Sequence, residues 1–467
     1  MLLTARPVLQ AGLLFSLCSI LVGCQSYEPL PLDAAPRLIT DPRTLVRTPP
    51  PGWPSSVALD PSAPLDATGF AVLVLENNPD LKSGRADRDI AEAQVLQAGL
   101  LPNPQLSGNY GALLGGPANF DAWTAGFSED IKGLITLSAQ RASARLDARK
   151  VDADLLWQEW QAIGKARLLF VDAVEQQKLH RLLLENRALF AARAERSRHA
   201  LAAGDIDLTT ATPDLTALGD LDKQIADLDR QILSRQHDID ALLGLSPDVQ
   251  LRFVDHVDLP PIDPATVESS LSTLPQRRPD LVALQLGYGA QEEKVRGAIL
   301  AQFPALTFGG TGGSDTSHVL TFGPQITFEL PIFNRNQGNI AIEHATRRKL
   351  HDEYRSRLTA AAGEVTAMLR EQALLQRQLT EVGTALVQAT GIADRADRAY
   401  RVGNIDERTF VDLQMVRLAK QQELVALEQQ MLEQRVAMAT LTGTGMPPIT
   451  VPTSDPPPPD PQTAGAE

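Results

Sequence analysis

Residues 320–330 read Leu-Thr-Phe-Gly-Pro-Gln-Ile-Thr-Phe-Glu-Leu, and this stretch decides the fold. Its apolar side chains alternate strictly with polar or small ones. One side carries Leu320, Phe322, Ile326, Phe328 and Leu330, and the other Thr321, Gly323, Gln325, Thr327 and Glu329. A period of two residues indicates a β-strand with one greasy and one polar face. A run of about 10 such residues has the length of a tilted transmembrane strand.

An earlier stretch, residues 123–131, has the same pattern and reads Trp-Thr-Ala-Gly-Phe-Ser-Glu-Asp-Ile. Only Glu129 departs from its greasy face, which is tolerable if Glu129 sits at the membrane edge. Each stretch is predicted to form the second strand of a β-hairpin, the first over 104–132 and the second over 304–330. A single hairpin of this kind would favour a soluble β-sandwich, whose strands alternate in the same way.

The number of predicted strands argues for an oligomer. Four strands cannot close into a membrane barrel, which needs at least about eight. An open strand edge in lipid leaves backbone groups unpaired at a cost of several kcal/mol each. If these strands enter a membrane, the barrel must therefore be shared between chains.

Long helices are predicted after each hairpin, because no proline occurs at 118–212 or at 332–446. A helix over about 134–202 is expected to turn back at Gly204, and its counterpart at Gly403, as helices do at a C-terminal glycine. The helix after Gly204 carries a heptad seam, which indicates coiled-coil packing. The seam consists of Leu218, Leu221, Ile225, Leu228, Ile232, Arg235, Ile239 and Leu242, and its last six positions recur as Leu424, Leu427, Met431, Gln434, Met438 and Leu441.

The chain also repeats itself at an offset of about 200 residues. The sequence at 78–81, Asn-Pro-Asp-Leu, recurs at 278–281 as Arg-Pro-Asp-Leu, and the sequence at 204–207, Gly-Asp-Ile-Asp, recurs at 403–406 as Gly-Asn-Ile-Asp. We therefore divide the chain into a signal peptide (1–23), a Pro-rich linker (24–68), repeat one (69–247), an inter-repeat linker (248–268), repeat two (269–445) and a disordered Pro-rich tail (446–467). Each repeat holds a helix, a hairpin and a long helical pair, and the Pro-rich segments are expected to be extended and solvated.

The first 24 residues have the features of a bacterial export signal. Arg6 precedes an apolar stretch over residues 9–22, which is too short for a membrane span and is typical of a secretory signal. The tetrad Leu21-Val22-Gly23-Cys24 resembles a lipobox, in which the cysteine is diacylated and becomes the mature N-terminus. Two acyl chains provide the double anchor that stable attachment requires. The alternative is an ordinary signal peptide in which Cys24 is incidental.

Composition and motifs argue against other classes of protein. The formal charge of −14 and the lack of a Lys/Arg cluster exclude nucleic acid as an expected partner. His344 and His351 lie two helical turns apart but form no metal-ligand pattern, and the glycines at 309–313 lack the Lys-Ser/Thr of a phosphate loop. No catalytic constellation is present, so we expect neither enzyme activity nor a cofactor other than the covalent lipid on Cys24.

The lipobox, the two copies and their Gly-x-Ile turns together resemble the TolC-like outer-membrane efflux family over about residues 70–445. Residues 323–338 are the most specific part, and they look like the strand-to-helix exit into the family's second long helix. The wording Phe-Asn-Arg-Asn-Gln-Gly at 333–338 looks closest to the branch that exports heavy-metal cations.

The resemblance implies a mixed α/β membrane protein that functions as a trimer. Its twelve-stranded barrel would lie in the outer membrane and continue into a periplasmic tunnel of twelve helices. The implied partners are two further copies, a periplasmic adaptor, an inner-membrane pump of the RND type and outer-membrane lipid. The chain would be the passive exit channel of a tripartite efflux system.

Asp412 is the candidate residue for the pore entrance. It lies nine residues after Gly403, where the family has an Asp-Ala-Gln sequence and this chain has Asp412-Leu413-Gln414. Three symmetric copies would ring the tunnel entrance. The alternative is a surface carboxylate paired with Arg408 four residues earlier, worth a few tenths of a kcal/mol. The family often has a second Asp six residues after the glycine, where Thr409 stands here.

Two other functions fit parts of the sequence. A periplasm-spanning coiled-coil tether or adhesin would keep the heptads and the lipid anchor but would need no barrel strands. A lipoprotein enzyme with helical accessory regions ranks last, because no catalytic motif is present.

The lipobox yields a direct test. Cys24→Ser should abolish acylation and leave unprocessed precursor, while the strands, which insert by different contacts, should still fold. Mass spectrometry of the wild-type mature N-terminus measures this, and a mature protein without an acyl group would disprove the anchor.

Overall fold

The computed structural model describes residues 26–47, 63–117, 120–445 and 449. The chain divides into two units, 1–38 and 39–467, and the described residues 26–38 of the first unit carry no helix or strand. The predicted signal peptide with Cys24, and the tail apart from Ile449, lie outside the described residues. The second unit holds all the described helices and strands.

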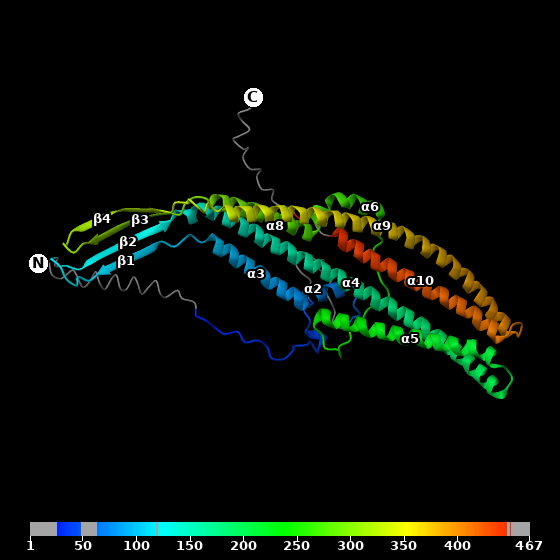
Figure 1. Cartoon of the computed structure of the whole chain (residues 1–467). Coiled ribbons are helices and arrows are strands. Elements are labelled where there is room, and N and C mark those ends of the chain that lie inside the picture. Colours follow the sequence, from blue (N-terminus) through cyan, green and yellow to red (C-terminus); the bar gives the residue numbers. More distant parts are fainter. Residues whose placement is uncertain (1–25, 48–62, 118–119, 446–448, 450–467) are drawn as a thin grey trace, which may run out of the picture. The chain divides into compact units, whose positions relative to one another are not determined.

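The described elements of this unit follow one another in an order that recurs (Figure 1). The short helices η2 (Pro42–Thr44) and α2 (Ala67–Asn77) come first. The series α3 (Pro79–Gly99), β1 (Gln105–Gly111), β2 (Ala122–Asp130), α4 (Ile131–Ala203) and α5 (Leu208–Leu243) comes next. After α6 (Pro264–Ser270), η3 (Leu271–Thr273) and α7 (Leu274–Arg277), the series α8 (Pro279–Leu300), β3 (Leu306–Ser314), β4 (Leu320–Phe328), α9 (Gln337–Arg401) and α10 (Glu407–Thr442) has the same order.

The four strands form one antiparallel sheet in the order β1-β2-β3-β4. The strands lie within the two hairpins that the alternation predicts. Strands β2 and β3 pair with each other and join the two hairpins, so β1 and β4 are the edges. The sheet lies at one end of the long helices, and the turns of α4 into α5 and of α9 into α10 lie at the other (Figure 1).

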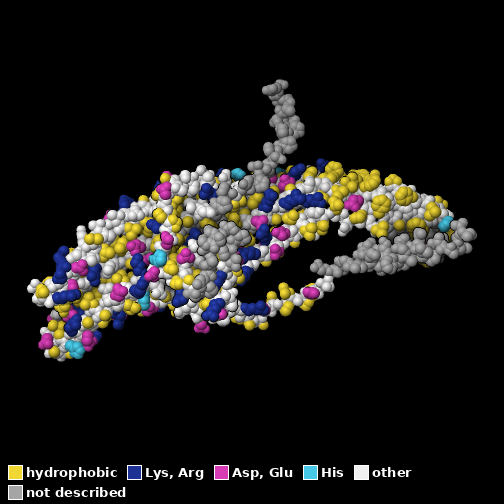
Figure 2. Space-filling view, turned by 180° about the vertical axis from the view of Figure 1, so that it is seen from behind, with side chains coloured by type: hydrophobic (Ala, Val, Ile, Leu, Met, Phe, Trp, Pro, Cys, Tyr) yellow, Lys and Arg dark blue, Asp and Glu magenta, His cyan; other side chains and the backbone are white. Residues whose placement is uncertain are grey.

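The two faces of the sheet differ sharply in chemistry. Cross-strand partners share a face, so the register assigns every residue to one side. The apolar face carries Leu106, Tyr110, Trp123, Phe127, Phe308, Leu320, Phe322, Ile326 and Phe328, all of them exposed. The polar face carries Gln105, Ser107, Asn109, Thr124, Ser128, Asp130, Thr307, Thr311, Thr321, Gln325 and Thr327 among glycines. Figure 2 shows hydrophobic side chains gathered over the strand end of the molecule.

Glycines on β3 permit the close pairing of the two hairpins. A side chain at Gly309 would overlap the carbonyl oxygen of Phe127, and one at Gly313 would overlap that of Trp123. Both positions face β2, so only glycine allows the strands of the two hairpins to approach this closely.

The helix α4 is 73 residues long, which corresponds to about 110 Å at the standard rise. It begins three residues before the predicted start, because the Asp130 side chain accepts a hydrogen bond from the Lys132 backbone N–H and caps the first turn. It ends at Gly204, whose φ of 79° is the left-handed conformation expected for a C-terminal glycine. None of the described helices is long and apolar enough to cross a membrane.

The helix seams are buried at half of their predicted positions and half-buried at the others. On α5 the fully buried seam residues are Leu221, Leu228, Ile239 and Leu242. On α10 they are Met431, Gln434 and Met438. The two polar seam residues have different surroundings: Arg235 is paired with Asp238 at 2.9 Å, whereas the Gln434 amide donates to the Met368 carbonyl oxygen at 3.1 Å.

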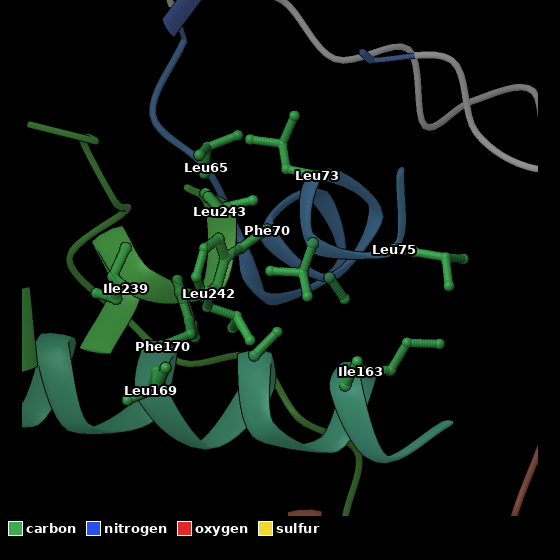
Figure 3. Packing of buried hydrophobic residues seen from close by; sticks show 14 of the residues in the cluster. Leu65, Phe70, Leu73, Leu75, Ile163, Leu169, Phe170, Ile239, Leu242 and Leu243 are labelled. Atoms are coloured by element: carbon green, nitrogen blue, oxygen red, sulfur yellow. The ribbon is translucent and has the colours of Figure 1, made fainter. Parts of the chain in front are cut away.

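The main hydrophobic cluster lies where α2 packs against α4 and α5. Phe70 and Phe170 are fully buried, and both rings meet Phe253 edge-on, at 5.2 and 5.5 Å between centroids. Figure 3 shows Phe70 and Phe170 between these helices. Nearly all of α2 is buried, so it has no periodic polar face and the sequence pattern did not predict it.

The expectation that the linkers are solvated holds for many of their described residues, but it is wrong for several apolar ones. Leu45 and Leu65 of the first linker and Val249 and Val267 of the second are buried. Ile39 and Leu65 form parallel β-bridges with Leu245 and Phe253. The helices alone do not cover their apolar surface, and these segments complete the core.

Candidate functional site

Two helical turns form the end of the unit opposite the sheet, and each is built in the same way. Gly204 and Gly403 take left-handed φ angles of 79° and 76°. Asp207 and Asp406 then cap α5 and α10 by accepting hydrogen bonds from the backbone N–H groups of Thr210 and Thr409. Thr409, at the position of the family's second Asp, is thus part of the first turn of α10.

The cap bonds hold both aspartates in the charged form. Hydrogen bonds from the hydroxyl and then the backbone N–H of Thr210 lower the pKa of Asp207. Bonds from the backbone N–H and then the hydroxyl of Thr409 lower the pKa of Asp406. A carboxylate with a lowered pKa stabilises its turn at neutral pH, and this contribution is lost as the pH falls below the ordinary range of aspartate.

Asp412 lies in the second turn of α10 and pairs with an arginine from a different helix. Its Oδ1 atom is 3.1 Å from Nη1 of Arg193, which belongs to α4. The alternative partner considered from the sequence, the guanidinium of Arg408, is wrong: Arg408 contributes only its backbone carbonyl, which accepts from the same Arg193 nitrogen at 3.0 Å. Arg193 approaches from the neighbouring helix, where packing fixes its position, and so it takes the place of the helix-internal partner.

Arg193 is the centre of this cluster, which we call the turn cluster (Arg193, Asp214 and Asp412). The Arg193 side chain is only 7% exposed and also meets Oδ1 of Asp214 on α5 at 2.5 Å. Asp214 is 8% exposed and accepts a further bond from the Ser197 hydroxyl at 2.5 Å. The Asp412 side chain, in contrast, is 57% exposed. One arginine therefore ties α4, α5 and α10 together and leaves one carboxylate open to solvent.

Sequence reasoning found Asp412 and missed Arg193 and Asp214. A signal for them exists in the repeat: a shift of 199 residues replaces Arg193 by Ile392 and Asp214 by Leu413. Charged residues at positions that are apolar in the other copy break the quasi-symmetry. Such a break points to a local interaction that only one repeat makes.

The other histidine and carboxylate candidates do not converge on a site. Within the described residues, no group of three His, Cys, Asp or Glu side chains could hold a metal ion. The Nδ1 atom of His351 lies 3.4 Å from Oδ1 of Asp352, its neighbour in sequence. Near the middle of α10, burial raises the pKa of Glu433, and the neighbouring Asp172 raises it further.

Several known proteins are similar to this chain. Residues 271–444 match the model of the family described as "Outer membrane efflux protein". The chain is 25% identical to the pyoverdine export outer membrane protein OpmQ of Pseudomonas putida, over 89% of this chain and 96% of that protein. The chain is therefore similar in sequence to outer membrane efflux proteins.

Solved structures agree on the fold. The outer membrane channel CmeC of Campylobacter jejuni has a TM-score of 0.67 at 16% identity, over 81% of this chain and 86% of CmeC. CusC, whose structures concern folding and transmembrane channel formation, has a TM-score of 0.63 at 18% identity, over 81% of this chain and 92% of CusC. The chain therefore has the fold of these outer-membrane channels.

The turn cluster should contribute to the stability of the folded chain. Arg193→Met leaves Asp214 as a buried carboxylate without its cation, which should cost about 3–5 kcal/mol. The double variant Arg193→Met/Asp214→Leu removes both charges and should recover most of that loss, since buried pairs are often replaceable by apolar residues. Hydrogen exchange of the α4–α5 turn measures the stability of the single and the double variant. A double variant as unstable as the single one would contradict the pairing of Arg193 with Asp214.

Proposed function

We propose that this chain is the outer-membrane exit channel of a tripartite efflux system, a passive conduit without enzyme activity. The single observation that carries the proposal is the sheet. It has one continuous apolar face, one polar face, and two edges, β1 and β4, with no strand beside them among the described residues.

The apolar face is suited to lipid and the polar face to a water-filled lumen. Transmembrane barrels alternate apolar-out and polar-in along every strand. The nine exposed apolar side chains on one face would be costly in water, and a contiguous patch of this kind marks an interaction surface. The alternative, a coiled-coil tether, gives no reason for this face.

The open edges support a trimer. Every backbone group in a bilayer core must be paired, and only closure removes an edge. If β1 of one chain pairs with β4 of the next, three chains close a barrel of twelve strands, four from each. The paired helices α4–α5 and α9–α10 of three chains then continue as a tunnel into the periplasm, where the family's adaptor and RND-type pump would meet the turns.

The lipid anchor and the cargo complete the proposal. The lipobox at Leu21–Cys24 supports diacylation of Cys24 and attachment to the outer membrane. The sequence of residues 333–338 is the support for a heavy-metal cation as the exported solute. The relative in Pseudomonas putida is named for export of pyoverdine, so the chemistry of the lumen has to decide what passes.

Asp412 is proposed as the pore-entrance residue. The turn cluster holds one arginine and two aspartates, so its net charge is 1 − 2 = −1 per chain. Three copies near the tunnel axis would focus a negative potential that favours cations. The exposed side chain of Asp412, and not buried Asp214, is the part of the cluster that a passing ion can approach.

Planar bilayers test both the channel and its entrance. The purified protein should conduct ions, whereas a tether should not. Asp412→Asn should reduce cation selectivity in a salt gradient, and Asp412→Lys should reduce it further or reverse it, since the net charge of the cluster rises to 0 and then to +1. Asp89→Asn on α3 removes one charge elsewhere and should leave the reversal potential unchanged. Identical potentials for wild type and Asp412→Lys would remove Asp412 from the pore.

A further inference from the structure

The polar face of the sheet carries carboxylates at one end only, the end that meets the long helices. Asp130 is the last residue of β2, and Glu329 directly follows β4. Each stands at the point where a hairpin passes into a long helical segment, one in each half of the chain. No sequence motif singled them out, because only the strand register shows that they share a face.

The register places the two carboxylates on the same face of the sheet, two strands and one row apart. Asp130 pairs with Thr307, and Thr307 pairs with Thr327, so these three residues form one row across β2, β3 and β4. Glu329 follows Thr327 by two residues, and its N–H donates to the Ala305 carbonyl oxygen at 2.9 Å, which continues the ladder past the end of β4. Both side chains therefore belong to the polar face, on adjacent rows.

The remainder of this face is uncharged. Along the described strands, the polar face otherwise carries hydroxyl, amide and glycine positions and Ala122. The other acidic residue of the strands, Glu129, pairs with Phe308 and lies on the apolar face. Asp130 and Glu329 are both exposed, and neither has a salt-bridge partner in the described part of the chain.

Asp130 is held in position by its cap. Its Oδ1 atom accepts the Lys132 backbone N–H at 3.0 Å, which fixes the carboxylate at the start of α4. A carboxylate fixed by the backbone cannot swing away from the lumen at little cost. Asparagine caps helices about as well as aspartate, so the charge can be removed without losing the cap.

We propose that Asp130 and Glu329 form a carboxylate ring at the inner end of the exit barrel, and that this ring favours cationic solutes over anionic ones. The proposal rests on the proposed function, in which the polar face lines a lumen shared by three chains. Two carboxylates from each of three chains then place six negative charges where the tunnel opens into the barrel. This ring is separate from Asp412, which lies at the far end of the helices.

The physical basis is the potential of like charges in a confined lumen. Walls of low dielectric focus the field of charges of one sign and raise the local concentration of counter-ions. Thr327 is a suitable reporter: it lies about 7 Å along the strand from Glu329 and about 10 Å across two strands from Asp130. Both distances are within or close to the Debye length of about 10 Å at 0.1 M salt.

The experiment uses a cysteine at Thr327 in the full-length protein in outer membranes. Its reaction rates with a cationic and an anionic methanethiosulfonate are compared, with the chain lacking this cysteine as the blank. At 0.1 M salt, Asp130→Asn/Glu329→Gln should lower the cationic-to-anionic rate ratio about threefold or more. At 1 M salt, where the Debye length is about 3 Å, most of the difference should vanish.

The matched control is Glu129→Gln, which removes one acid next to Asp130 but on the opposite face. It should leave the ratio at the wild-type value. A ratio that the double variant does not change, or that Glu129→Gln changes equally, overturns the ring. A cysteine at Thr327 that water-soluble reagents cannot reach, while one at Phe328 is reached, would instead refute the proposed channel.

Discussion

A β-sheet edge cannot face lipid, and this constraint organises the whole molecule. The backbone N–H and C=O groups along β1 and β4 need partners, and the bilayer core offers none. The sheet itself is complete in every other respect, with continuous registers across all three strand pairs. Gly309 and Gly313 allow β2 and β3 to pair closely enough that the two halves of the chain form one sheet. In the proposed channel, the missing closure comes from other copies, so that channel requires assembly.

The long helices extend from the sheet to the turns at the opposite end of the unit (Figure 1). α4 continues directly from β2, since Asp130 is both the last strand residue and the helix cap. At the other end, Arg193 joins three helices through two carboxylates and one carbonyl, so the turns are tied to one another. Between these two ends the helices pack through apolar seams and are linked by ion pairs such as Arg85–Glu159 and Lys178–Glu428.

Much of this fold follows from the sequence because its signals are periodic. Alternation placed the four strands, and the absence of proline with a terminal glycine placed α4, whose start moved by three residues through a cap. The helix α2 was not predicted, because a segment buried on all sides shows no hydrophobic period. The packing of the linkers was not predicted either, because Leu65 or Phe253 looks like any apolar residue in a Pro-rich stretch. Asp412 was found by resemblance, but its partner Arg193 comes from a helix more than 200 residues earlier. Only the packing of α4 against α10 brings them together.

Edge pairing between copies is the most direct test of the account. A chain with cysteine at Asn109 on β1 and a second cysteine at successive polar-face positions of β4 should cross-link between copies, because side chains opposite each other on antiparallel strands come within disulfide range. The shared barrel should give covalent trimers under oxidising conditions for at least one β4 position, and none when either cysteine is omitted. A ladder extending beyond trimers, or monomers at every β4 position, would contradict the shared barrel.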